Sequence, residues 1–249
     1  MMGERVGSDN ATIALETRLR SLRDRIGEAT AHANREPDDI QLVAVSKTVP
    51  VEVLLDAYAL GLRVFGENRV QEAQEKIAAL ALPDIRWELI GHLQTNKANR
   101  AAELFARVQS VDSVRLAEAL SARAVALGKT LPVLLEVNVA DEASKSGFAS
   151  EETLAAARAI ANLPGLRPEG LMTIAPLVDD PEGVRLVFRT LRELRDQLRE
   201  AIPLGDNGGW PELSMGMSDD FAVAIEEGAT LIRLGRALFG ARPAAPGVQ

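Results

Sequence analysis

The first residue of this chain that could do covalent chemistry is a lysine at the end of an apolar, β-rich run. The run reads LVAVSKT at residues 42–48. Because side chains alternate along a strand, Val43, Val45 and Lys47 share one face. If that face lines a barrel, Lys47 stands at the mouth of an apolar tube, where a desolvated lysine amine attacks aldehydes more readily. The alternative is a lysine that simply ends a strand and reaches solvent.

Two later runs have the composition of an anion site. LSMGMS at 213–218 offers hydroxyls, a glycine and backbone N–H groups at a predicted helix start, and RLGR at 233–236 ends a predicted strand. Helix starts attract anions, and barrels frequently bind phosphate with the loops after strands seven and eight. Each run also has a purely structural explanation, since Ser218 could be a helix N-cap and Gly235 a turn glycine. Together with Lys47, they predict a site for a phosphorylated aldehyde.

Three more residues at predicted strand ends are weaker candidates. Asn68 either caps the helix that follows it or enters the site, and the two explanations are equally supported. Met172 is better explained by packing inside the barrel than by a contact with a cofactor. For His92, a hydrogen bond within its loop is favoured over a role as general base.

The elements that must position these residues alternate regularly between strand and helix. Such alternation predicts a parallel sheet, which eight units can close into a barrel. We therefore predict one α/β domain, a (β/α)8 TIM barrel over residues 41–240, with an extra N-terminal helix over 11–33 whose apolar residues recur at helical spacing. A doubly wound open sheet is the rival, but no Gly-rich turn of dinucleotide type follows the first strand. The expected strands are 41–46, 63–65, 86–90, 107–111, 132–137, 168–173, 212–215 and 231–234, and the expected barrel helices are 51–60, 70–80, 95–105, 113–127, 151–162, 181–200 and 219–227.

Composition narrows the class of protein. A chain of 249 residues is the length of one such barrel, and its net charge of -8 argues against nucleic acid as a partner. No apolar run approaches a membrane span, and no signal-peptide core is apparent. The chain has no cysteine and only two histidines, so we expect no metal site and a cytoplasmic location. We predict a surface loop at residues 202–210 and a frayed tail at residues 243–249.

Six ordered motifs resemble the YggS/PROSC family, the pyridoxal phosphate homeostasis proteins. The resemblance spans roughly residues 10–242. The motifs are VAVSKT at 43–48, FGENRVQE at 65–72, IGHLQTNK at 90–97, GLMT at 170–173, MGMSDDF at 215–221 and RLGRALFG at 233–240.

This resemblance implies a fold-type III barrel, as in the N-terminal domain of alanine racemase, that carries pyridoxal 5′-phosphate (PLP) as a covalent aldimine on Lys47. It also implies phosphate contacts from Ser214, Gly235 and the adjoining backbone, and Arg233 facing the pyridine nitrogen. Many relatives have Thr at the position of Arg236, and an inward-turned Arg236 would add a cation to the phosphate site. The predicted cofactor-binding set is Lys47, Asn68, Met172, Ser214, Met215, Arg233, Gly235 and Arg236.

The same residues predict weak catalysis or none. An arginine beside the ring nitrogen keeps it unprotonated, which makes the ring a poor electron sink. A racemase also needs a second acid/base on the far side of its substrate. We expect no C-terminal β domain to deliver one, and the only tyrosine, Tyr58, falls in a predicted helix away from the mouth.

The leading hypothesis is therefore a monomeric protein of intracellular PLP homeostasis. It would sequester vitamin B6 aldehyde and supply it to PLP-dependent apoenzymes, with indirect effects on amino-acid and keto-acid pools. The alternative is a weak PLP-dependent amino-acid racemase. A third hypothesis, an aldolase that uses Lys47 on its substrate without PLP, is disfavoured because aldolase lysines usually lie on a later strand.

Overall fold

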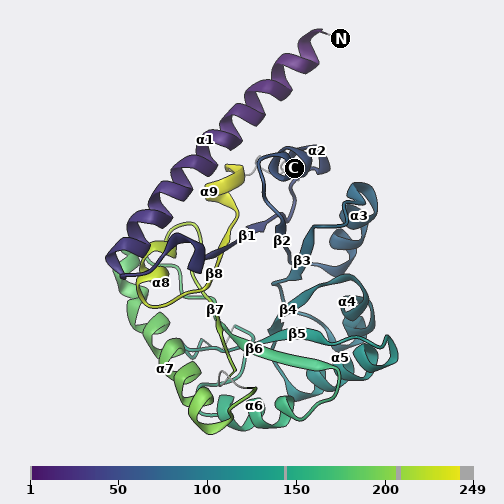
Figure 1. The fold of residues 1–249 in the computed structure, drawn as a ribbon, viewed down its shortest axis with the longest axis vertical. Coiled ribbons are helices and arrows are strands. Elements are labelled where there is room, and N and C mark those ends of the chain that lie inside the picture. Colours follow the sequence, from purple (N-terminus) through teal and green to yellow (C-terminus); the bar gives the residue numbers. More distant parts are fainter. Residues whose placement is uncertain (1, 143–144, 206–208, 242–249) are drawn as a thin grey trace, which may run out of the picture.

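The eight strands of the protein form a closed parallel barrel in the order of the sequence, β1 to β8. The structure is a computed structural model that describes residues 2–142, 145–205 and 209–241. Figure 1 shows the strands encircled by helices α2 to α8. The strands are β1 (Gln41–Val45), β2 (Val64–Glu67), β3 (Arg86–Leu89), β4 (Arg107–Val111), β5 (Leu131–Glu136), β6 (Leu166–Met172), β7 (Glu212–Ser214) and β8 (Leu231–Leu234). The predicted (β/α)8 barrel is thus confirmed, and the rival open sheet is wrong.

The barrel helices lie close to their predicted positions, whereas α1 begins at Met2, nine residues before the predicted start at Ala11. They are α1 (Met2–His32), α2 (Val51–Ala59), α3 (Val70–Leu80), α4 (Ala98–Leu104), α5 (Val114–Ala126), α6 (Thr153–Ala161), α7 (Arg185–Ala201), α8 (Phe221–Glu226) and α9 (Arg236–Phe239). Two predicted helices begin instead with a 3-10 turn, at Thr95–Lys97 and Pro181–Val184. Helix α9 was missed, because four residues between Gly235 and Gly240 are too few to show a helical period.

The N-terminal helix covers the side of the barrel where the chain closes on itself. Leu15, Leu19, Leu22 and Ile26 are buried at helical spacing, as the sequence predicts, whereas Ile13, which belongs to the same apolar stripe, is 60% exposed. The helix contacts α2, α8 and α9, and the Arg18 guanidinium donates a hydrogen bond of 2.7 Å to the carbonyl oxygen of Leu238. Figure 1 shows α1 continuing beyond the barrel toward the N-terminus.

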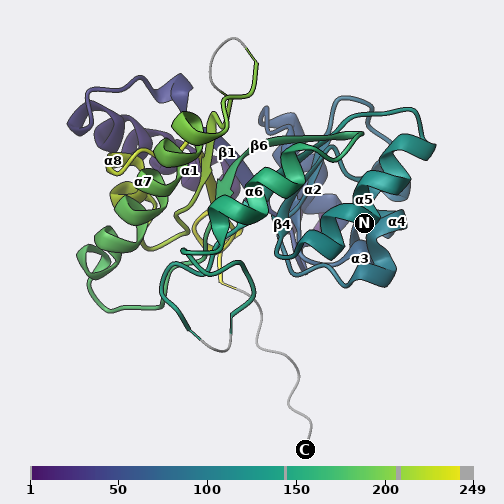
Figure 2. The ribbon, with the colours of Figure 1, turned by 90° about the horizontal axis from the view of Figure 1, so that it is seen from below.

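Residues buried on the strands divide between two cores, because side chains alternate across a sheet. The larger core lies between the strands and the surrounding helices. Figure 2 shows α7 and α8 on one side of the barrel and α3, α4 and α5 on the other. The smaller core fills part of the barrel interior and consists of Val43, Val45, Val64, Ile90, Leu134, Met172 and Leu231. Val43 and Val45 thus face the barrel interior, as predicted, and Met172 packs against them in the same cluster.

The segment predicted as a surface loop at 202–210 is anchored more deeply than expected. Trp210 at its end is fully buried, and its indole N–H donates a hydrogen bond of 2.9 Å to the carbonyl oxygen of Ile202. Residues 206–208 of this loop, and the predicted tail at 243–249, lie outside the described residues.

Candidate functional site

Lys47 lies in a tight turn directly after β1, at the C-terminal mouth of the barrel. It is half-buried, and the next residue, Thr48, has a left-handed backbone with a φ of 63°. Gly235 follows β8 and abuts this strand end, since a methyl group on Gly235 would lie 3.4 Å from the Cβ of Val45. The lysine turn and the loop after β8 are therefore neighbours, as barrel closure predicts.

A buried ionic cluster holds the backbone on both sides of Lys47. The Lys76 ammonium donates to the carbonyl oxygen of Ser46 at 2.6 Å and to the carboxylates of Glu67 and Glu72 at 2.7 and 2.6 Å. Glu72 in turn accepts from the backbone N–H of Thr48 at 2.6 Å. Burial raises the pKa of Glu67, although hydrogen bonds from Lys76 and Ser46 oppose that effect.

Arg233 is a buried cation in the barrel interior, 4% exposed. Its guanidinium donates to the Ser214 hydroxyl at 2.6 Å and to the carbonyl oxygen of Thr173 at 2.8 Å. Burial lowers its pKa to about 10, while the nearby carboxylates of Glu136 and Asp220 oppose the shift. Arg233 therefore stays charged at neutral pH, and its two bonds fix it between β6, β7 and β8.

Ser214 lies beside Arg233 inside the barrel. Its hydroxyl is fully buried, accepts from Arg233 and donates to the side-chain oxygen of Gln109 at 2.6 Å. The hydroxyl proton of Ser214 is thus donated to Gln109. Its predicted contact with phosphate stays a prediction.

The loops after β7 and β8 are bound to each other. The Ser218 hydroxyl accepts from the backbone N–H of Ala237 at 3.1 Å, and the backbone N–H of Arg233 donates to the carbonyl oxygen of Gly216 at 3.0 Å. Gly216 has a φ of 91°, and a methyl group on it would lie 2.6 Å from the Cβ of Ala224. Glycine is required here by both conformation and space.

Arg236 turns outward rather than into the mouth. Its side chain is 64% exposed and pairs with the carboxylate of Asp219. The extra cation that an inward-turned Arg236 would add to the phosphate site is therefore not present in this conformation.

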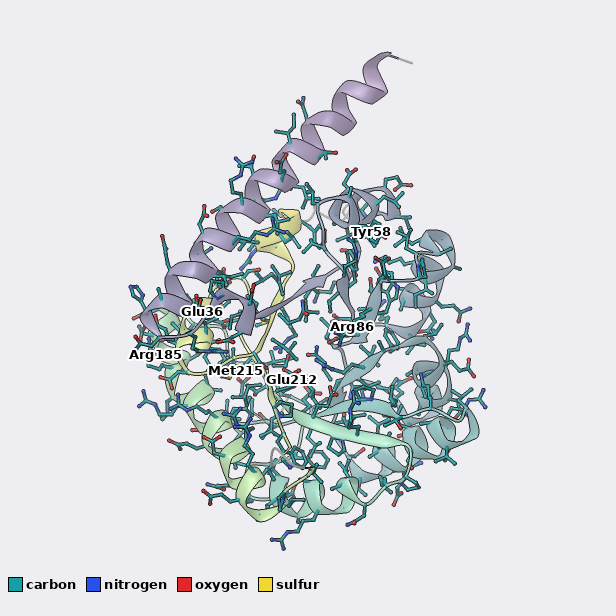
Figure 3. The ribbon with its side chains drawn as sticks, in the orientation of Figure 1. Glu36, Tyr58, Arg86, Arg185, Glu212 and Met215 are labelled. Carbon is teal, nitrogen blue, oxygen red and sulfur yellow. The ribbon has the colours of Figure 1, made fainter. Side chains whose placement is uncertain are left out.

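The remaining predicted residues line the neighbouring strand ends. Met215 and Met172 are fully buried. Met172 packs in the barrel interior, whereas Met215 belongs to the larger core and lies on the α7 and α8 side of the molecule (Figure 3). Asn68 is half-buried after β2, and its Oδ1 atom is buried without a hydrogen-bond partner among the described residues. A methyl group on Gly91 would lie 2.6 Å from the backbone oxygen of Asn68, so the loops after β2 and β3 touch.

Glu136 is a buried carboxylate at the mouth that the sequence reasoning missed. Burial raises its pKa to about 7; Asp112 adds to the rise, while Arg233 and His92 oppose it. Its Oε2 atom has no hydrogen-bond partner in the described part of the chain. The alternation of side chains along a strand could have identified it, because Glu136 stands two residues after Leu134 and so faces the barrel interior as Leu134 does.

His92 makes polar contacts at the rim with residues of two other loops, rather than within its own loop. Its Nδ1 atom lies 2.8 Å from a carboxylate oxygen of Asp112 and 3.3 Å from the Ser146 hydroxyl. Both partners meet the same ring nitrogen, which differs from the arrangement of a catalytic triad, where the base uses its two nitrogens for different partners.

Tyr58 is remote from this site. Its hydroxyl donates to Asp84 at 2.7 Å, and the Arg63 guanidinium stacks 3.8 Å from the centre of its ring. Figure 3 shows it with α2, outside the ring of strands. Within the part of the chain that the structure describes, no helix is long and apolar enough to cross a membrane.

The barrel and this site define a known class of protein. Residues 17–243 match the family described as alanine racemase, N-terminal domain, and the chain belongs to it. The chain is 44% identical over 225 residues to the pyridoxal phosphate homeostasis protein of Aquifex aeolicus, covering 90% of this chain and 97% of that protein. It is 47% identical over 218 residues to the protein of the same name from Pseudomonas aeruginosa, covering 88% and 91%. Within the wider family, it is a member of the pyridoxal phosphate homeostasis proteins.

Solved structures agree with this placement. PipY of Synechococcus elongatus, in a structure described as having PLP bound, superposes with a TM-score of 0.79 at 39% identity, covering 91% of this chain and all of that one. An alanine racemase of Clostridium difficile gives a TM-score of 0.71 at 17% identity, covering 92% of this chain and 57% of that one. That second likeness shows the fold alone.

Proposed function

We propose that this protein binds PLP at the C-terminal mouth of its barrel and serves the intracellular homeostasis of PLP. The observation that carries the proposal is the convergence of an amine, Lys47, a buried cation, Arg233, and two linked loops at one end of adjacent strands. The names of the relatives and the PLP described with PipY support the same conclusion.

The described residues fit the chemical groups of PLP. Lys47 supplies the amine for a Schiff base with the aldehyde, and the ionic cluster around Lys76 holds its turn. Arg233 supplies N–H donors to the ring nitrogen, because a guanidinium has five and two are used by Ser214 and Thr173. The loops after β7 and β8, joined by Ser218, supply backbone and hydroxyl groups to the phosphate.

The same arrangement favours holding PLP over catalysis with it. Bound PLP supplies an aldehyde that condenses with amines and a ring that accepts electrons best when its nitrogen is protonated. A charged Arg233 donates to that nitrogen and opposes its protonation. Tyr58, the only tyrosine, is held by Asp84 far from the mouth. For the racemase alternative, the support is a likeness of fold at 17% identity.

The rest of the proposed role concerns the cell. We infer that the protein is a cytoplasmic monomer that sequesters PLP and passes it to PLP-dependent apoenzymes. The acidic composition, with a net charge of -8, supports a partner other than nucleic acid.

The visible absorption spectrum of the purified protein, before and after borohydride, tests the proposal. We expect a yellow protein in which borohydride fixes a pyridoxyl group on Lys47, as peptide mapping would identify. Lys47→Ala should abolish the reducible colour. Lys129→Ala is the matched control, because Lys129 precedes β5 at the opposite end of the barrel and bonds to the carbonyl oxygen of Phe105. Full reducible colour in Lys47→Ala would overturn the assignment.

A further inference from the structure

A chain of polar side chains runs through the barrel interior and ends at Arg233. Glu88 on β3 accepts from the side-chain NH2 of Gln109 on β4 at 2.5 Å. The Gln109 side-chain oxygen accepts from the Ser214 hydroxyl at 2.6 Å, and Ser214 accepts from Arg233 at 2.6 Å. Glu88, Gln109 and Ser214 are all fully buried.

The chain begins at the floor of the barrel. The second carboxylate oxygen of Glu88 lies 3.3 Å from the guanidinium of Arg86 and 3.7 Å from that of Arg107. Figure 3 shows Arg86 toward the interior of the ring of strands. Glu88 thus divides its two oxygens between cations on the floor and Gln109 above it.

Each hydrogen bond in this chain has one direction when Glu88 is ionised. Burial raises the pKa of Glu88, while Arg107, Gln109 and Arg86 favour its ionised form. An ionised carboxylate accepts and cannot donate, so Gln109 presents its NH2 to Glu88 and its oxygen to Ser214. Ser214 must then donate its single proton to Gln109. Its lone pairs are left for Arg233, which can only donate. The carboxylate on β3 therefore determines the polarity of a contact on β8.

We propose that Glu88 and Gln109 are positioning residues for Arg233, which set the polarity of Ser214 and so hold the guanidinium at the cofactor's ring nitrogen. The inference rests on the proposed function, in which Arg233 faces that nitrogen. The residues touch neither cofactor nor substrate, and act through Ser214. A purely packing role would not depend on which atoms donate and which accept.

Glu88→Gln should reverse this polarity without changing side-chain size. The substituted amide can donate to the Gln109 oxygen, so that Gln109 turns its NH2 toward Ser214. The Ser214 proton then points at Arg233, where two donors oppose each other. We expect PLP affinity to fall about tenfold or more, as for the loss of a charge-assisted hydrogen bond, and the absorption spectrum of bound PLP to shift.

A charge-swapped double variant provides the rescue. In Glu88→Gln with Gln109→Glu, the introduced amide on β3 donates to the introduced carboxylate on β4, whose other oxygen still accepts from Ser214. Net charge and composition are unchanged, and the polarity at Ser214 is restored. We expect this variant to regain most of the lost affinity and the wild-type spectrum.

The experiment measures PLP affinity by equilibrium dialysis, the visible spectrum of bound PLP, and the melting temperature of each variant. Glu169→Gln is the matched control, because Glu169 pairs with Arg107 on the same floor, at 2.9 Å, and is not part of the chain to Arg233. Gln109→Met, which removes the acceptor of Ser214, provides a second arm if Glu88→Gln does not fold.

The outcomes separate this inference from the proposed function. Lost affinity and a shifted spectrum in Glu88→Gln, with recovery in the swap and wild-type behaviour in Glu169→Gln, support the inference. Wild-type affinity and spectrum in Glu88→Gln or in Gln109→Met would overturn the inference while the proposed function stands. Equal losses of affinity in the charge-swapped double variant and in Glu88→Gln would also overturn the inference alone. A wild-type protein that does not bind PLP would overturn both.

Discussion

The Lys76 ammonium lies 2.6 Å from the carbonyl oxygen of Ser46, the residue immediately before Lys47. Lys76 stands on α3, thirty residues later in the chain. It is buried with Glu67 and also pairs with Glu72, whose side chain is 26% exposed. This contact links a helix outside the barrel to the backbone beside Lys47. The rigidity of the Lys47 turn is therefore expected to depend on an ion cluster that does not enter the mouth.

Lys76→Met should destabilise the protein and weaken its hold on PLP. Removing one partner of a buried ion pair typically costs about 3–5 kcal/mol, because the remaining charge is left unpaired. Urea denaturation measures the stability, and the borohydride-reducible fraction of PLP measures the site. Arg20→Met is the control, since Arg20 pairs with Glu16 on the exposed face of α1, and such pairs contribute about 0–1 kcal/mol. Equal effects of the two substitutions would refute the importance of the cluster.

Stability should depend on pH through Glu136, whose pKa is raised to about 7 in the folded protein. Between the ordinary pKa and pH 7, the unfolded chain loses this proton while the folded protein keeps it, so stability falls as pH rises through that window. From the ordinary value of 4.5 to about 7, the loss amounts to at most about 3 kcal/mol. Below the ordinary pKa, Glu136 carries no such penalty.

Glu136→Gln removes the titrating group and tests that dependence. The variant should gain more stability, relative to the wild type, at pH 8 than at pH 5. Denaturant unfolding at both pH values, at a fixed PLP concentration, measures the difference. Glu118→Gln on the exposed side of α5 is the control and should show no such difference. A gain that is the same at both pH values would contradict the assignment.

Gly216→Ala should damage the loop after β7. A φ of 91° costs an L-residue roughly 1–2 kcal/mol, and the added methyl group meets Ala224 at 2.6 Å. We expect a lower melting temperature and weaker binding of PLP. Gly27→Ala in α1 is the opposite control, because nothing lies within 4 Å of its added methyl group and helix propensity favours alanine by about 0.5–1 kcal/mol.

Pyridoxal without its phosphate should bind much more weakly than PLP. The loops joined by Ser218 and Ala237 supply the phosphate contacts in our proposal, and each lost charge-assisted hydrogen bond costs about 1.5–3 kcal/mol. Titration of the protein with both aldehydes, followed by absorbance, gives the ratio of affinities. Similar affinities would remove the phosphate site from the proposal.

Turnover of amino acids should be slow or absent although the cofactor is held. In the proposed site Arg233 would face the ring nitrogen and oppose its protonation, and Tyr58 is bound to Asp84 away from the mouth. The measurement is deuterium incorporation at the α-carbon of alanine and serine, with free PLP as the reference because it catalyses this exchange unaided. Fast, stereoselective exchange by the wild-type protein would favour the racemase alternative.

Much of the fold was predictable because its signals are local. The alternation of short apolar runs with helical stretches indicated eight β/α units, and the parity of Val43 and Val45 placed one face of β1 inside the barrel. The motifs around Lys47, Ser214 and Arg233 carried the resemblance to the family. Periodicity of two or 3.6 residues and motif spacing are properties of neighbouring residues, so they can be read without tertiary structure.

The partners of those residues were decided only by the closed barrel. The interior contacts join Ser214 to Gln109, 105 residues earlier, and Arg233 to Thr173, 60 residues earlier. The outward turn of Arg236 toward Asp219 likewise depends on how two loops meet. Such contacts follow from strand register and barrel closure, which bring distant residues together at a geometry that no local pattern encodes. The sequence by itself therefore determined the order of strands and helices and the face of β1 that lines the interior, whereas the tertiary structure decided which interior side chains touch and in which direction each hydrogen bond runs.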